Sequence, residues 1–153
     1  MTDLRNGYVS LARIALGLAA ACGLQANAGS PTYKVTELGT LGGAQSGAYG
    51  LNESNHVVGW SHTASGAIHA FVWIDGVMTD LGTLGGPASR AWAINDADVI
   101  VGEAHPTGQS GDGGYRAFIY QNQQMTALPT LGGTWSAAYD INTDGVIAGL
   151  STP

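Results

Sequence analysis

A hexapeptide that recurs along the chain is the feature that most constrains how the chain can fold. Leu-Gly-Thr-Leu-Gly-Gly begins at Leu38 and again at Leu81, and Leu-Pro-Thr-Leu-Gly-Gly begins at Leu128, so the periods are 43 and 47 residues. Periods of roughly 40 to 50 residues are typical of proteins in which each copy forms one small unit that packs against the next. The sequence therefore predicts a stack of similar units.

The similarity between the copies extends beyond the hexapeptide. A Ser, an Ala, an aromatic residue, an aliphatic residue, an Asn and a Gly recur in the same order; in the second copy they are Ser89, Ala91, Trp92, Ile94, Asn95 and Gly102. The second half of the unit occurs only twice, at 69–73 and 116–120. The predicted organisation is a lead-in strand at 29–37, repeats at 38–80 and 81–127, and a partial repeat at 128–153.

These motifs resemble the HAF family of bacterial extracellular repeat proteins, which takes its name from the His-Ala-Phe found here at 69–71. The hexapeptide, the Ile-Asn turn and the His-Ala-Phe-Val-Trp strand belong to its pattern, and the resemblance covers nearly all of the chain from Tyr33 onward. The second copy departs from the pattern, with Arg116 in place of His and Tyr120 in place of Trp. The resemblance implies an extracellular location and a repeat architecture, but little chemistry.

Each full copy is expected to form four short strands. In the second copy they lie at about 89–94, 99–104, 115–121 and 124–128, where β-branched and aromatic residues dominate. Asn- and Asp-rich segments between them are typical of hairpin turns. Four antiparallel strands per copy predict an all-β, β-propeller-like array that is incomplete at about 2.5 repeats; a β-solenoid or an irregular sandwich is the alternative. Eleven strands are expected, and no helix after the first 28 residues.

The N-terminal residues predict an export signal. Two arginines accompany the start of a short apolar run at 14–24, and the small residues Ala26 and Ala28 follow it. This pattern indicates a signal peptide at 1–28 that is cleaved near Ala28, and the apolar run is too short to span a bilayer. We therefore expect a secreted, extracellular or periplasmic protein without a membrane span. Its single cysteine, Cys22, would leave with the signal, so the mature chain would fold without disulfides.

Composition excludes one class of partner. The chain has 5 Lys and Arg residues against 11 Asp and Glu residues, and the net charge is −6. The basic residues form no stripe or cluster, so the sequence predicts no binding to nucleic acid. The open edges of an array with fewer than four blades instead predict self-association, with a glycan or another protein as further partners.

No motif in the sequence predicts catalysis. In the segment 59–63, Thr63 stands where a hydrolase nucleophile elbow needs its second glycine. The hexapeptide lacks the lysine of a phosphate-binding loop and precedes a strand, whereas such a loop precedes a helix. Most acidic residues lie in predicted turns, which gives no carboxylate pair for glycoside hydrolysis. We therefore expect a protein that is not an enzyme, with no catalytic, metal-binding or cofactor-binding residues.

Five residues are candidate ligand contacts. Trp60 and Trp135 occupy repeat positions that hold a polar residue in one other copy, so we expect exposed rings, whereas Trp92 shares its position with tyrosines and is expected in the core. His62 and His105 occupy equivalent positions after the second strand and are expected to lie in exposed loops, because no third metal ligand recurs beside them. Asp112 lies in the Gly-rich insertion of the second copy. Calcium held between loops is the one cofactor that remains open.

The sequence leaves several functional hypotheses. The first is a secreted non-enzymatic β-repeat module that acts as a structural or interaction surface outside the cell. The second is a lectin-like module that binds carbohydrate or calcium through Trp60, Trp135 and the 105–114 loop. The third is a truncated fragment of a longer extracellular repeat protein or of a secreted hydrolase. The ligand and the oligomeric state are not determined by the sequence.

Overall fold

The structure of the chain is a computed structural model that describes residues 10–11, 33–111 and 114–153. The expected signal peptide at 1–28 and its cleavage site fall outside the described residues, apart from 10–11. The described residues form strands and turns without an α-helix, which confirms the all-β prediction. The same residues contain no helix that is long and apolar enough to cross a bilayer.

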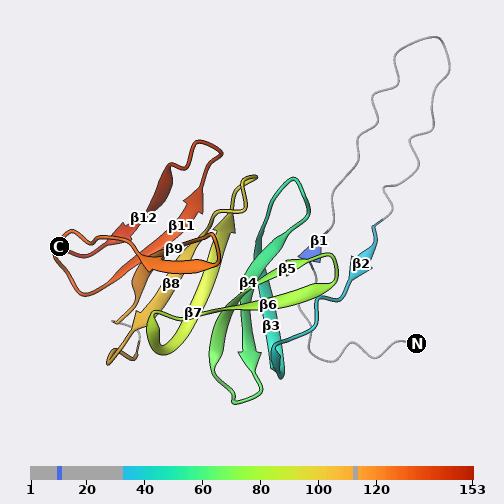
Figure 1. The fold of residues 1–153 in the computed structure, drawn as a ribbon, viewed down its shortest axis with the longest axis horizontal. Helices are drawn as coiled ribbons and strands as arrows, with labels where there is room; N and C mark the ends of the chain where they lie inside the picture. Colours follow the sequence, from blue (N-terminus) through green and yellow to red (C-terminus); the bar gives the residue numbers. More distant parts are fainter. Residues whose placement is uncertain (1–9, 12–32, 112–113) are drawn as a thin grey trace, which may run out of the picture.

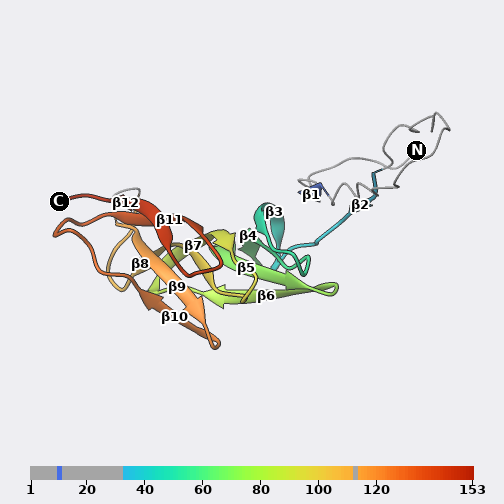
Figure 2. The same cartoon turned by 90° about the horizontal axis from the view of Figure 1, so that it is seen from above.

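The copies follow one another in chain order across the molecule, the third copy at one end and the first toward the other (Figures 1 and 2). Between residues 33 and 153, with 112–113 left out, the structure has eleven strands, which is the number expected from the sequence. A short strand β2 (Val35–Thr36) pairs with β1 (Ser10–Leu11). The repeats comprise β3 (Gly42–Leu51), β4 (Val57–Thr63), β5 (Ile68–Ile74), β6 (Val77–Gly82), β7 (Gly85–Ile94), β8 (Ile100–Pro106), β9 (Arg116–Gln121), β10 (Gln124–Ala127), β11 (Ser136–Ile141) and β12 (Ile147–Ser151).

Successive strands within each copy pair antiparallel, from β3 to β6, from β7 to β10, and from β11 to β12. A single parallel bridge between Ile68 and Ala88 joins β5 to β7, so the first eight of these strands count as one mixed sheet. The hairpin β11–β12 forms a sheet of its own, and no sheet closes on itself. The expected division into separate four-stranded units is therefore not confirmed.

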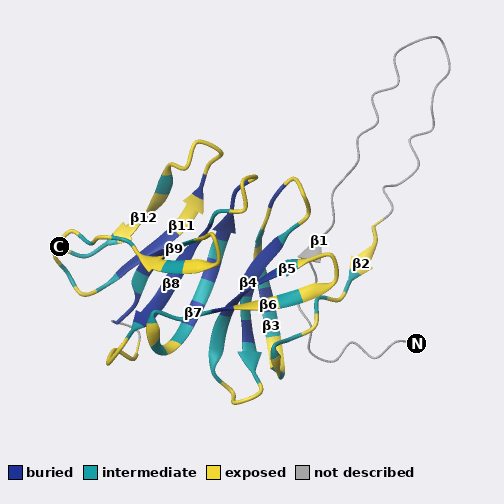
Figure 3. Cartoon of the chain, in the orientation of Figure 1, coloured by how far each residue is buried: buried dark blue, intermediate teal, exposed yellow. Residues whose placement is uncertain are grey.

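The hydrophobic core lies between neighbouring copies (Figure 3). The first cluster joins the first and second copies and contains Val58, Ala70, Val72, Leu81, Ala91, Ile94, Ile100, Ala104 and Phe118. The second joins the second and third copies through the equivalent positions Val101, Ala117, Ala138 and Ile141, with Ile119 and Leu128 packed against them. Burial of apolar area between copies, which is the main stabilising effect, therefore also orders the stack.

The hexapeptide of the second copy forms the hinge between the first two copies. Strand β6 ends at Gly82 and β7 begins at Gly85, and both glycines have positive φ, at 73° and 94°. The hydroxyl of Ser89 donates to the carbonyl of Gly82 at 2.5 Å and accepts from the backbone N–H of Ala70 at 2.8 Å. In the third copy Pro129 replaces this first glycine, and proline is restricted to negative φ. There the chain is irregular until β11 begins at Ser136.

A β-bulge recurs in the first strand of every copy and explains two recurring residues. In the second copy Ala91 lies opposite Gly102 and Ala93 opposite Val101, so Trp92 is the extra residue. The same register shift occurs at Tyr49 and Tyr139. A Cβ atom at Gly102 would overlap the carbonyl oxygen of Arg90, so only glycine fits beneath the bulge. Bulges re-aim side chains, and here they turn the aromatic rings of the three copies toward one another.

Candidate functional site

The three recurring asparagines end the first strand of each copy and shape the turn that follows. In the second copy the Oδ1 atom of Asn95 accepts the backbone N–H groups of Ala97 and Val99, both at 3.0 Å. Oδ1 of Asn52 accepts equivalent N–H groups in the first copy, and Oδ1 of Asn142 accepts the N–H of Val146. Asparagine is favoured in such turns because its side chain bonds the backbone two to four residues later.

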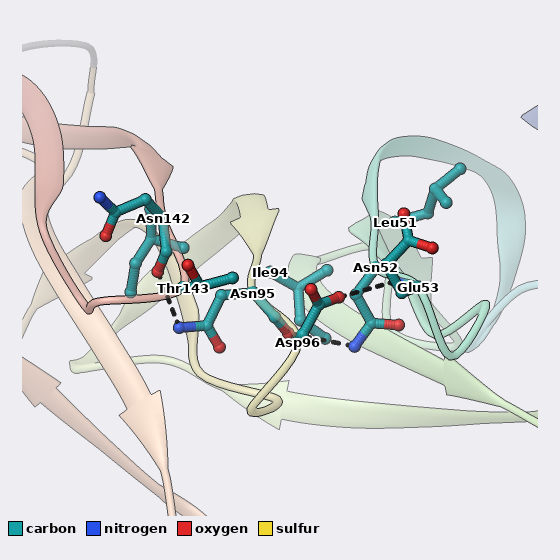
Figure 4. Close-up of a pocket in the computed structure, with 9 residues that line it drawn as sticks. Leu51, Asn52, Glu53, Ile94, Asn95, Asp96, Asn142 and Thr143 are labelled. Carbon is teal, nitrogen blue, oxygen red and sulfur yellow. Dashed lines mark hydrogen bonds between the residues drawn. The ribbon is translucent and has the colours of Figure 1, made fainter.

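In the first two copies, the other end of the asparagine amide links one copy to the next (Figure 4). Nδ2 of Asn52 donates to the carbonyl of Asn95 at 3.1 Å, and Nδ2 of Asn95 donates to the carbonyl of Asn142 at 3.0 Å. We call this chain of bonds the asparagine ladder. Asn52 and Asn95 are buried, whereas Asn142 is exposed. Sequence reasoning predicted the turns, but it did not predict that the same side chains join the copies.

The asparagine ladder forms the floor of a shallow pocket with a volume of about 320 Å³. Each copy contributes three lining residues from the end of its first strand and the turn that follows: Leu51, Asn52, Glu53, Ile94, Asn95, Asp96, Ile141, Asn142 and Thr143. The carboxylate of Asp96 accepts the backbone N–H of Glu53 at 2.8 Å, so this wall also joins two copies. The pocket offers amide and carboxylate groups beside aliphatic side chains, which suits hydrogen bonding to hydroxyl groups.

The aromatic residues of the three bulges form a second chain of contacts, which we call the aromatic ladder. The rings of Tyr49 and Trp92 stack with their centroids 4.6 Å apart. The ring of Tyr139 meets Trp92 from the other side at 5.9 Å, edge to face. Nε1 of Trp60 donates to the hydroxyl of Tyr49 at 2.9 Å. The expectation that Trp92 belongs to the core is refined, because its ring joins three copies.

Of the four predicted ligand contacts that the structure describes, it brings two together. The rings of Trp60 and His62 lie edge to face on β4, 5.5 Å apart, and both side chains are half-buried. Trp135 is also half-buried and precedes β11 in the third copy, so neither Trp stands fully free in solvent. Asp112 lies outside the described residues.

The prediction of exposed loop histidines is wrong for His105. This side chain is 3% exposed on β8, and its ring stacks on Tyr115 at 3.8 Å. The carbonyl of Gly111 lies 2.8 Å from its Nε2 atom, which fixes the ring beneath the insertion loop. Repeat equivalence with His62 did not predict this, because the loop that covers His105 is longer than its counterpart in the first copy.

His105 belongs to a buried polar cluster that sequence reasoning missed. Nη1 of Arg90 lies 3.3 Å from Oε1 of Glu103 and donates to the hydroxyl of Tyr115 at 2.8 Å. Burial raises the pKa of the Glu103 carboxyl above its usual range, and the neighbouring Arg90 partly offsets this. The signal was present in the sequence: Arg90 and Glu103 replace the uncharged Gly47 and Trp60 of the first copy as a pair.

Replacing Glu103 by glutamine is expected to flatten the pH dependence of stability. Because the pKa of this carboxyl is raised in the folded chain, the folded state binds more protons than the unfolded state just above the ordinary value of 4.5. The free energy of unfolding contributed by Glu103 therefore falls as the pH rises from 4.5 toward the folded pKa. Urea unfolding of the wild-type chain and E103Q across this range measures the difference. Parallel pH profiles would contradict the assignment.

Over the described residues, no three His, Cys, Asp or Glu side chains gather as a metal site would require. The fold and the two ladders together define an all-β protein in which recurring side chains join the three sequence copies. The chain matches no protein-family model, curated protein or solved structure.

Proposed function

We propose that this chain is a secreted, non-enzymatic β-repeat module that acts as a structural or interaction surface outside the cell. Its resemblance to the HAF family implies the extracellular location and the repeat architecture. The observation that carries the proposal is what the recurring residues do. Ser89 and Asn95 bond to neighbouring copies, Trp92 stacks between them, and Gly102 makes room for the bulge. Their recurrence is thus accounted for by assembly of the stack, without a catalytic role.

We further infer a propeller-like arrangement of the copies. The first strands of the three copies, β3, β7 and β11, lie side by side in chain order, because β7 contacts β3 on one side and β11 on the other. The remaining strands of each full copy follow outward as an antiparallel meander. Propeller blades are four-stranded meanders of this kind. The parallel bridge between β5 and β7 is a single residue pair, which is a minor link beside the antiparallel registers.

Export is tested by expressing the full chain in a bacterial host and determining the intact mass of the protein outside the cytoplasm. The expected product begins at Gly29, because Ala26 and Ala28 are the small residues that a signal peptidase reads. A chain that keeps its first 28 residues and stays in the cytoplasm would contradict the proposed location.

The lectin-like alternative is favoured by one observation, the half-buried ring of Trp60 beside Tyr49, which is 50% exposed. Such aromatic platforms stack on sugar rings. A glycan array with and without calcium separates the two functions, and the surface proposal expects no glycan signal. A glycan signal that the wild-type chain gives and that Trp60→Ala abolishes would replace the surface proposal by the lectin.

A further inference from the structure

We propose that the partner of this surface is a second copy of the chain, bound head to tail. The head face is the side of the first copy that carries Ala48, Tyr49, Leu51 and the carbonyl of Asn52. The tail face is the side of the third copy that carries Tyr139, Ala148 and the amide of Asn142. This inference rests on the proposed function and names its partner.

The apolar residues of the two faces are the separated halves of a contact that the chain already makes twice. Ile94 and Ile141 are 7% exposed in the two core clusters, whereas Leu51, at the same repeat position, is 45% exposed. On the opposite side, Val58 and Val101 are fully buried, whereas Ala148 at their position is exposed. Burying exposed apolar surface of this kind is stabilising. The head face carries the same repeat positions that are buried in the two contacts between copies within the chain.

The asparagine ladder supplies the direction. The carbonyls of Asn95 and Asn142 each accept two N–H groups, one from their own turn and one from the preceding asparagine. Among the described residues, the carbonyl of Asn52 accepts only the turn N–H of Asn55, and Nδ2 of Asn142 has no acceptor. A donor is left at the tail and an acceptor at the head. The missing rung is a hydrogen bond from Nδ2 of Asn142 in one molecule to the carbonyl of Asn52 in another molecule of the same chain.

The aromatic ladder is open at the same two faces. Tyr139 is 45% exposed at the tail and Tyr49 is 50% exposed at the head, and the ring of each contacts Trp92 on its inner side only, Tyr49 by stacking and Tyr139 edge to face. Contact between Tyr139 and Tyr49 of the next molecule would continue the ladder. Two identical faces cannot complete the asparagine ladder, because donor would meet donor. The interface is therefore heterologous, and it closes into a ring or extends as a chain of molecules.

Two variants of the mature chain, 29–153, test the proposal. Leu51→Asp places a charge in the head face, and Ala148→Asp places one in the tail face; both side chains are exposed, so each variant is expected to fold. Light scattering over a concentration series should give masses above the monomer for the wild-type chain and the monomer mass for each variant alone. An equimolar mixture should give one-to-one dimers that do not grow, because one intact head meets one intact tail.

Val77→Asp serves as the matched control, because Val77 is exposed on β6 and belongs to neither face; it should assemble as the wild type does. Circular dichroism checks the fold of every variant. A wild-type monomer at all concentrations overturns the head-to-tail proposal and leaves the secreted surface with a different partner. Dimers that survive Leu51→Asp overturn it as well, and they point to pairing of the free β12 edge. Failure of export, by contrast, affects only the proposed function.

Discussion

Replacing Gly102 by alanine is expected to lower the free energy of unfolding by about 3 kcal/mol or more, which is a large share of the roughly 5–15 kcal/mol that holds a domain together. The added Cβ would overlap the carbonyl oxygen of Arg90 and lie 2.8 Å from Cε1 of Phe118, which is fully buried. Neither neighbour can withdraw, because one is backbone within the β7–β8 pairing and the other is a fully buried side chain of the first core cluster. The bulge would have to open.

The matched control is Gly145→Asn in the turn after β11. Gly145 has a φ of 80° and no atom within 4 Å of an added Cβ, and asparagine tolerates this conformation better than most residues. Its expected cost is about 1 kcal/mol or less. Urea unfolding followed by tryptophan fluorescence compares the two variants. If G102A lost no more stability than G145N, the steric account of the recurring glycine would be wrong.

Much of the fold could be predicted from the sequence because strand positions depend on local patterns. The β-branched residues at 99–101 predicted a strand at about 99–104, and β8 forms at Ile100–Pro106, while the Asn-rich segments predicted the turns. The hexapeptide predicted the change from one copy to the next, which the structure places between Gly82 and Gly85. Positive φ is the physical reason that glycine occupies both positions in the first two copies.

The parts that escaped prediction depend on which copies become neighbours in space. Trp92 was expected in the core from its repeat position, but the bulge that aims it at Tyr49 and Tyr139 is a matter of register between strands. His105 was expected in an exposed loop because no third metal ligand recurs beside it and its counterpart His62. Its burial follows from the insertion loop and from stacking on Tyr115, and repeat equivalence carries no information about an insertion.

Replacing Asn95 by alanine is expected to cost about 2–3 kcal/mol, since it removes two bonds within a turn and one bond between copies. Asn95→Asp keeps the oxygen acceptors and removes only the donor to the carbonyl of Asn142. The part of the stability loss that comes from the turn should therefore be smaller than for Asn95→Ala. A buried carboxylate beside the carbonyl oxygen of Asn142 adds a separate loss through repulsion. Asn142→Asp is the control, because it keeps the turn bond of an exposed residue and breaks no rung within the chain.

Hydrogen exchange distinguishes the two roles of Asn95. If the asparagine ladder holds the third copy, Asn95→Asp should raise amide exchange in the hairpin 136–151 more than in β4 and β5, because local opening is controlled by the contacts that the hairpin loses. The apolar contacts of Ala138 and Ile141 remain in this variant, so the hairpin should open more often without the whole chain unfolding. Uniformly faster exchange would instead mean that the carboxylate destabilises the entire stack. Unchanged exchange in 136–151 would show that the rung contributes nothing beyond apolar packing, and the direction argued for head-to-tail assembly would lose its energetic basis.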